Sequence, residues 1–185
     1  MAGLLLRPRA GVIAAAPWPR AEALTTRRLV LEPLRPDHAR ELAPVLADPA
    51  LHAFTGGEPA EEDELRARFA RQAAGRSPDG AQGWLNWIAR DRATHVAVGT
   101  VQATITDDEG ARTAALAWVV ATSRQGEGLA TEAARAARDW LRDHGVTRFV
   151  AHIHPGHGAS AAVARHLGLA ASDERRDGEV RWVGS

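Results

Sequence analysis

A glycine-containing loop is the first place in this sequence where residue types and spacing suggest chemistry. Residues 123–128 include Gly126 and Gly128, follow a strand-like segment and lead directly into a long helical pattern. Glycine lets main-chain N–H groups approach a ligand closely, and the first turn of a helix leaves several N–H groups without acceptors. Such a loop can hold a phosphate without any lysine. It lacks the third glycine of a dinucleotide fingerprint and the Gly-Lys-Ser/Thr of a Walker loop. An ordinary glycine-rich connection would have the same composition.

A second group of chemically capable residues lies nearer the C-terminus. His152, His154 and His157 fall within six positions and are followed by Ser160. Imidazole exchanges protons near neutral pH, so His154 and His157 are candidates for proton transfer, together with the hydroxyl of Ser160. His152 and His154 share a strand face, as metal ligands can, but no carboxylate completes a set, and we predict no metal site. Ser160 could equally cap the helix that follows.

The surroundings of both groups resemble the GNAT superfamily of N-acetyltransferases. Gln125-x-x-Gly128-x-Ala130 is similar to the family's acetyl-CoA loop, Gln/Arg-x-x-Gly-x-Gly/Ala. Residues 26–38 resemble the opening of the subgroup that includes the ribosomal-protein N-acetyltransferases. Residues 84–104, with Gly99, resemble its central hairpin, and residues 160–169 resemble its late helix. The resemblance extends over residues 24–183, nearly the whole chain.

The resemblance implies acetyl-CoA as co-substrate and assigns residues to it. The strand before the loop is expected to separate from its neighbour and to pair with the pantetheine arm, while the pyrophosphate rests on main-chain N–H groups. The N–H of Val119 or Val120 is the expected oxyanion donor, and the side chain of Glu127 is expected to face solvent. The full set expected to bind acetyl-CoA is Trp118, Val119, Val120, Gln125, Gly126, Glu127, Gly128, Leu129, Ala130, Thr131 and His157, where His157 replaces the Asn of the family's Asn-x-x-Ser.

The family's usual proton-transfer residues are missing. The position of its basic Glu corresponds to Ala115, and the chain contains no Tyr to act as the acid. We therefore expect His157 or Ser160 to protonate the thiolate, and His154 or a water chain to deprotonate the amine, unless positioning alone suffices.

The residues expected to contact the substrate are Phe54 and Trp87. Trp84 lies in the same region, and both tryptophans could instead pack in the core, as strand aromatics commonly do. The acids of the 107–109 turn would favour a cationic amine if they line the mouth of the site.

Composition excludes several classes of protein. The 185 residues carry 23 basic and 23 acidic side chains, and this zero net charge argues against a general binder of nucleic acid or of acidic membranes. All the basic residues other than histidine are Arg, and Lys, Tyr and Cys are absent. Schiff-base chemistry, thiolate nucleophiles and disulfides are therefore excluded.

The chain divides into a flexible tail, residues 1–23, and one domain, residues 24–185. No apolar run reaches the roughly 18 residues of a membrane span, and we expect a cytoplasmic protein, with a homodimer possible. Strands are expected at residues 29–34, 84–90, 96–105, 113–121, 148–154 and 180–183, and helices at 36–48, 61–74, 131–144 and 160–167. An antiparallel meander that runs into one βαβ unit predicts a mixed α+β fold, with a mostly antiparallel sheet and flanking helices.

These observations favour an acetyl-CoA-dependent N-acetyltransferase. The acceptor is expected to be a primary amine, on a protein N-terminus or a small molecule, and to attack the thioester directly. A catalytically silent acyl-CoA-binding module is the alternative, because the Glu and the Tyr are missing. A non-enzymatic protein with an empty fold is disfavoured, because the Gln125–Ala130 loop is intact.

Overall fold

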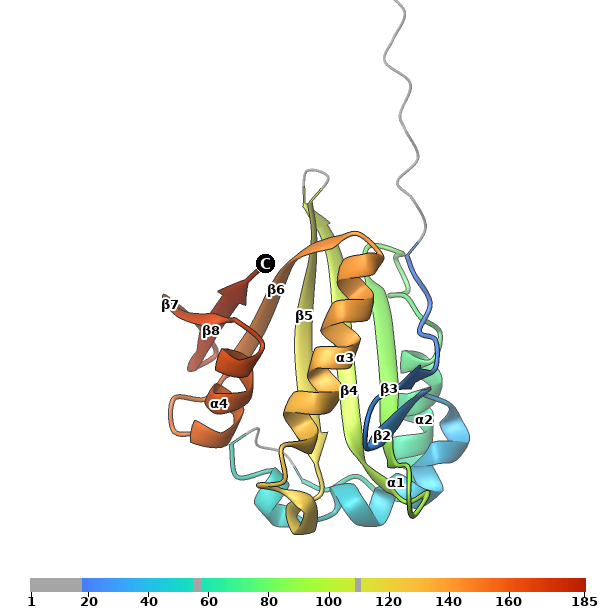
Figure 1. Cartoon of the computed structure of the whole chain (residues 1–185). Coiled ribbons are helices and arrows are strands. Elements are labelled where there is room, and N and C mark those ends of the chain that lie inside the picture. The colour runs from blue at the N-terminus through green and yellow to red at the C-terminus, as the bar shows by residue number, and fades with distance from the viewer. Residues whose placement is uncertain (1–17, 55–57, 109–110) are drawn as a thin grey trace, which may run out of the picture.

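The computed structural model describes residues 18–54, 58–108 and 111–185. Within them the chain forms an eight-stranded sheet with the order β1-β2-β3-β4-β5-β6-β8-β7 (Figure 1). Neighbouring strands are antiparallel except β5 and β6, which are parallel. This arrangement confirms the mixed α+β fold expected from the sequence. The strands are β1 Leu24–Thr25, β2 Leu29–Pro33, β3 Gly83–Asp91, β4 Ala97–Asp108, β5 Ala111–Val120, β6 Val146–Ile153, β7 Ala170–Arg176 and β8 Glu179–Gly184.

Helices cover both faces of the sheet. Helix α3 (Leu129–Asp143) and α4 (Gly158–His166) lie on one face, which we call the α3 face, and α1 (Ala39–Leu46) and α2 (Glu62–Gln72) lie on the other, the α1 face. Alternation along β3 shows the two faces: Trp87 packs in the core beneath α3, and its neighbour Ile88 packs with α1 and α2. Short 3-10 turns occur at Pro36–His38 (η1), Pro49–Leu51 (η2) and Thr122–Arg124 (η3).

Helix α3 is held on the sheet by small apolar side chains. Ala133, Ala134, Ala137 and Leu141 recur at spacings of three and four residues and are at most 1% exposed. Small residues let the helix axis approach the strands closely. The helix therefore starts directly beside the end of β5, where the loop between them turns.

The parallel pair β5 and β6 separates along its length. Register pairs run from Arg112↔Val146 to Ala115↔Val150, and no pair joins the strands beyond that point in the described residues. Residues 116–120 of β5 and 151–153 of β6 thus flank an opening, which we call the β5–β6 gap. β6 remains paired with β8 on its other side as far as Ile153↔Val180. The expected separation of the strand before the loop is confirmed.

Two parts of the chain differ from expectation. Of the segment expected to be a flexible tail, residues 1–17 lie outside the described residues, but residues 18–23 pack against the domain. The Trp18 ring covers Gly83, and the Trp87 indole N–H donates to the carbonyl of Glu22 at 2.7 Å. Strand β7 was not expected, because its side chains are mostly charged and exposed and show no alternation.

Candidate active site

The loop between β5 and α3 forms an open cradle of main-chain N–H groups. Gly126 and Gly128 have φ values of 80° and 78°, in the left-handed region that other residues avoid. Within the described residues, the N–H groups of residues 126–131 have no protein acceptor, whereas that of Gln125 donates to Thr122. Free N–H groups at the start of a 15-residue helix attract an anion. The free N–H groups expected in this loop are therefore present, and their binding of a phosphate stays a prediction.

Two arginines fix this loop to the neighbouring strands. Arg28 donates from Nη1 to the Glu127 carbonyl at 2.9 Å and from Nε to Glu132 at 2.7 Å. Arg124 bonds Glu127 at 2.8 Å and Asp91, at the end of β3, at 3.0 Å, and this hydrogen bond lowers the pKa of Asp91 to about 2. Glu127 is partly exposed, as expected, and its carboxylate is engaged in this ion pair. The loop is therefore held open while its N–H groups remain available.

A depression of about 430 Å³ lies directly beside the cradle. Arg28 and Arg135 line it together with Gly128 and Thr131. Glu132 and Asp139 line the same depression, so guanidinium and carboxylate groups lie together beside the cradle.

The main chain of β5 presents alternate peptide groups to the β5–β6 gap. The Ala121 N–H donates to Val98 of β4 at 2.8 Å, and the Val119 carbonyl also faces β4, where a Cβ on Gly99 would lie 2.0 Å from it. In a strand, the N–H and C=O of one residue point to the same side, and successive residues alternate between the two sides. The N–H and C=O groups of Trp118 and Val120 therefore face the gap. The Gln125 side-chain amide donates to the Val120 carbonyl at 3.1 Å. Val119, one of the two expected oxyanion donors, is therefore turned away, and Val120 is turned toward the gap.

A short stretch of chain connects the two sides of the gap at its open end. Residues 48–54, which we call the crossing segment, start beside η3 and end at α4. At one end the Thr122 hydroxyl hydrogen-bonds the carboxylate of Asp48, which lowers the pKa of that carboxyl. At the other end Phe54 stacks on His157, with ring centroids 4.4 Å apart, and contacts His154 at 5.5 Å. Phe54, an expected substrate contact, thus lies beside the histidine cluster.

The histidines after β6 have different environments. His157 directly precedes α4, and burial, followed by the charge of His154, lowers its pKa from the ordinary 6.5, so its ring is neutral at pH 7. His154 accepts the Gly156 N–H on Nδ1 at 3.1 Å. Its neutral form therefore carries the proton on Nε2 and has no free lone pair, which makes it unsuited to the expected role of base. Ser160 is the third residue of α4 and so is not its cap, as the sequence had also allowed.

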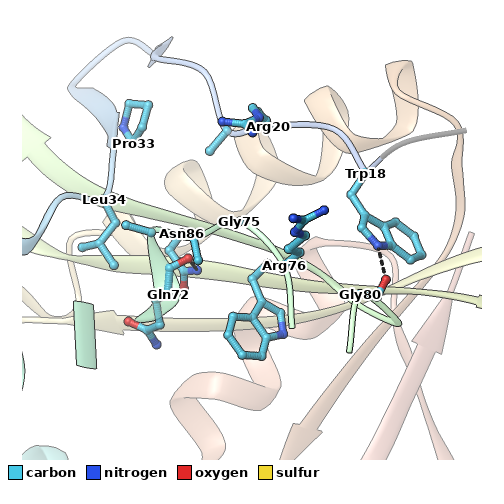
Figure 2. A pocket seen from close by; sticks show the side chains of 13 residues that line it. Trp18, Arg20, Pro33, Leu34, Gln72, Gly75, Arg76, Gly80 and Asn86 are labelled. Atoms are coloured by element: carbon cyan, nitrogen blue, oxygen red, sulfur yellow. Dashed lines mark hydrogen bonds between the residues drawn. The ribbon is translucent and has the colours of Figure 1, made fainter. Parts of the chain in front are cut away.

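Other expected substrate contacts lie elsewhere. Trp87 is fully buried and meets Trp140 edge to face at 6.0 Å, so the expectation that it contacts substrate is wrong, and the core alternative holds. Trp84 lines a cavity of about 600 Å³ on the other side of β3 from the gap. Trp18 lines the same cavity, and its indole N–H donates to the Gly80 carbonyl (Figure 2). Asp107 lies opposite Arg112, at the end of the sheet where β5 and β6 are still paired. Glu109 is outside the described residues.

The described residues form neither a metal site nor a membrane-spanning helix. Among residues 18–54, 58–108 and 111–185, no group of three or more His, Asp or Glu side chains could hold a metal ion. No helix in the described ranges has the length and hydropathy needed to cross a membrane.

Comparison with known proteins gives a consistent result. The family model "Acetyltransferase (GNAT) domain" matches residues 28–170. A search of curated proteins finds no match. The solved acetyltransferase from Agrobacterium tumefaciens str. C58 superimposes with a TM-score of 0.66 at 24% identity, covering 96% of this chain and 99% of its own.

Two ligand-bound structures are also similar in fold. The ribosomal L7/L12 alpha-N-protein acetyltransferase RimL, in complex with coenzyme A, has a TM-score of 0.70 at 18% identity, covering 88% of this chain and 97% of its own. AAC(6')-Ib, in complex with ribostamycin and coenzyme A, has a TM-score of 0.69 at 16% identity, covering 85% and 93%. These likenesses agree in fold with the family match, and that match over residues 28–170 shows that the chain belongs to the GNAT acetyltransferase family.

Proposed function

We propose that this protein transfers an acetyl group from acetyl-CoA to a primary amine, on a protein N-terminus or a small molecule. The observation that carries the proposal is the combination of a cradle of free N–H groups with a strand whose main chain faces an open gap. An exposed strand edge is a liability unless something pairs with it. A pantetheine arm, with its two amide groups, is suited to pair with Trp118 and Val120.

The residues present fit acetyl-CoA without a lysine. The N–H groups of residues 126–131 are suited to the pyrophosphate, and the Thr131 hydroxyl can add a further hydrogen bond. Arg28 and Arg135 line the depression on one side of the cradle, and their guanidinium groups can donate hydrogen bonds to the remaining phosphate. When bound, acetyl-CoA supplies the activated thioester.

The side chains and main chain around the gap can support direct attack by an amine. The Val120 N–H faces the gap and can stabilise a carbonyl oxygen that gains negative charge. Phe54 and His157 form a wall on the acceptor side, at the end of the crossing segment. With its lowered pKa, His157 is neutral at pH 7 and can hydrogen-bond the sulfur of the leaving group.

The runner-up is an acyl-CoA-binding module without catalysis. The observation that favours it is Ala115, which sits between Thr104 and Val150 where the family pattern places a carboxylate. The two functions predict the same affinity for acetyl-CoA and differ in turnover.

The test is a thiol-release assay with a panel of amines and N-terminal peptides. The proposal expects thermal stabilisation by acetyl-CoA, and amine-dependent release of coenzyme A together with an acetylated product. Stabilisation without release, across acceptors of both classes, would establish the binding module instead. If acetyl-CoA does not stabilise the protein, both the transferase and the binding module are excluded.

A further inference from the structure

We infer that His152 is the catalytic residue that accepts the proton of the incoming amine. This inference rests on the proposed function and names a residue that the sequence pattern did not single out for catalysis. It follows from the register of the sheet on both sides of the β5–β6 gap.

The register places His152 at the edge of the gap, on the α1 face. Ala115 and Val150 are the last paired residues of β5 and β6, and paired residues point to the same face of a sheet. Two positions further along each strand, Ala117 and His152 return to that face. They are therefore the first side chains on the α1 face beyond the last β5–β6 pair, one on each side of the gap.

The acceptor has access to the gap from the α1 face. On the α3 face the gap is lined by Leu116, Val120 and Ile153, all of which belong to the core beneath α3 and α4 and are at most 8% exposed. On the α1 face, Ala117 is exposed and His152 is half-buried. On the sheet, helix α1 packs mainly on β4 and α2 on β3, which lie on the other side of β5 from the gap. The amine and the thioester can therefore meet beside His152.

The ring of His152 is free to accept a proton. In contrast to His154, it makes no hydrogen bond with any described residue. Its partner across β6 and β8 is Arg181, whose guanidinium donates to the Glu174 carboxylate at 2.7 Å. From β5, the facing side chains are Ala115 and Ala117, which carry no charge.

With His152 as the proton acceptor, every proton of the reaction has a donor and an acceptor. The amine arrives as an ammonium ion and gives one proton to a ring nitrogen of His152. The freed nitrogen lone pair forms the C–N bond to the thioester carbonyl carbon, the C–S bond breaks, and its electron pair stays on sulfur. The second proton, released from the amide nitrogen, neutralises the thiolate, and His152 returns its proton to solvent. One ammonium and one thioester give one amide, one thiol and one proton.

The experiment compares His152→Gln with wild type and with His144→Gln, which alters an exposed imidazole at the far end of α3. Expected is a fall in kcat of about 100-fold or more for His152→Gln, typical of losing a general base, with unchanged acetyl-CoA affinity by calorimetry. The pH profile of the rate should differ in shape between wild type and His152→Gln, because only wild type carries the proton-accepting imidazole. Imidazole added to His152→Ala should restore part of the rate.

Two results would overturn the inference. One is a His152→Gln enzyme within about threefold of wild type, a change too small for a lost general base. The other is a pH profile of the rate that has the same shape in wild type and in His152→Gln, because removal of the proton acceptor should change that shape. Loss of activity in His154→Gln with retention in His152→Gln would assign the proton to the other histidine. A wild-type protein that binds no acetyl-CoA or acetylates no amine would instead show that the proposed function is wrong.

Discussion

Phe54 stacks on His157 with ring centroids 4.4 Å apart and ring planes inclined by 19°. This contact joins the end of the crossing segment to the residue that precedes α4. The other end of the segment is fixed by the Asp48–Thr122 hydrogen bond beside the cradle. The crossing segment thus joins η3 to the start of α4 across the β5–β6 gap, and its stacking contact offers a direct way to test the proposed acceptor wall.

Replacing Phe54 with Ala should weaken acceptor binding and leave acetyl-CoA binding unchanged. Loss of the ring removes apolar contact area and frees His157, so we expect the acceptor KM to rise about tenfold, as for the loss of 1–2 kcal/mol of aromatic packing. Phe54→Leu is the matched variant, since it keeps apolar bulk without the stacking and should lie between wild type and Ala. An unchanged acceptor KM in Phe54→Ala would show that this residue is not part of the acceptor wall.

Arg28→Ala should lower affinity for acetyl-CoA. The variant loses the hydrogen bond to the Glu127 carbonyl and the positive charge beside Gly128, and hydrogen bonds of a charged group contribute about 1.5–3 kcal/mol, or roughly 10- to 100-fold in Kd. The neighbouring Arg27 is exposed and is the matched control. Calorimetric titration of both variants should show weaker binding for Arg28→Ala alone. Equal affinities would mean that Arg28 does not shape the cradle.

Gly99→Ala should destabilise the protein and impair its activity together. A Cβ at this position would lie 2.0 Å from the Val119 carbonyl, so β5 must shift away from β4. We expect the free energy of unfolding to fall by about 1–3 kcal/mol, as in overpacked cores, with a lower kcat because the Val120 N–H moves. Gly158→Ala is the control, since nothing lies within 4 Å of its Cβ position. Urea unfolding that matches wild type would contradict the close approach.

The buried His38 should make stability depend on pH. Burial lowers its pKa below the ordinary 6.5, so the unfolded chain binds a proton at pH values where the folded chain does not. Stability is then greatest above pH 6.5 and falls as the pH is lowered through 6.5 toward the folded pKa. His157, whose pKa is also lowered, contributes with the same sign.

His38→Asn should reduce this pH dependence. The Asn oxygen can still accept the Arg35 N–H that His38 accepts at 3.1 Å, but it does not titrate. We expect a smaller fall in melting temperature between pH 7 and pH 5 in the variant than in wild type. Parallel melting curves at all pH values would exclude a contribution from His38.

The sequence predicted the parts of the fold that depend on local pattern. The Gly126–Gly128 loop and the helix after it follow from glycine conformation and from apolar spacing, and both are present. Trp87 shows the limit of such patterns, since a strand aromatic can face a ligand or the core, and sheet register decides which. For the same reason, the sequence pattern did not identify His152 as a candidate base. Its place across the gap from Ala117 depends on where β5 and β6 stop pairing, which no local spacing reveals.

The most direct test of the central claim is amine-dependent release of coenzyme A by the wild-type protein and by Gly128→Val. Gly128 has φ 78°, which a β-branched residue does not tolerate, so the variant should lose the cradle. We expect wild type to release one thiol for each acetylated amine, and Gly128→Val to bind acetyl-CoA weakly and turn over slowly. Equal acetyl-CoA affinity and equal turnover in the two proteins would contradict the central claim.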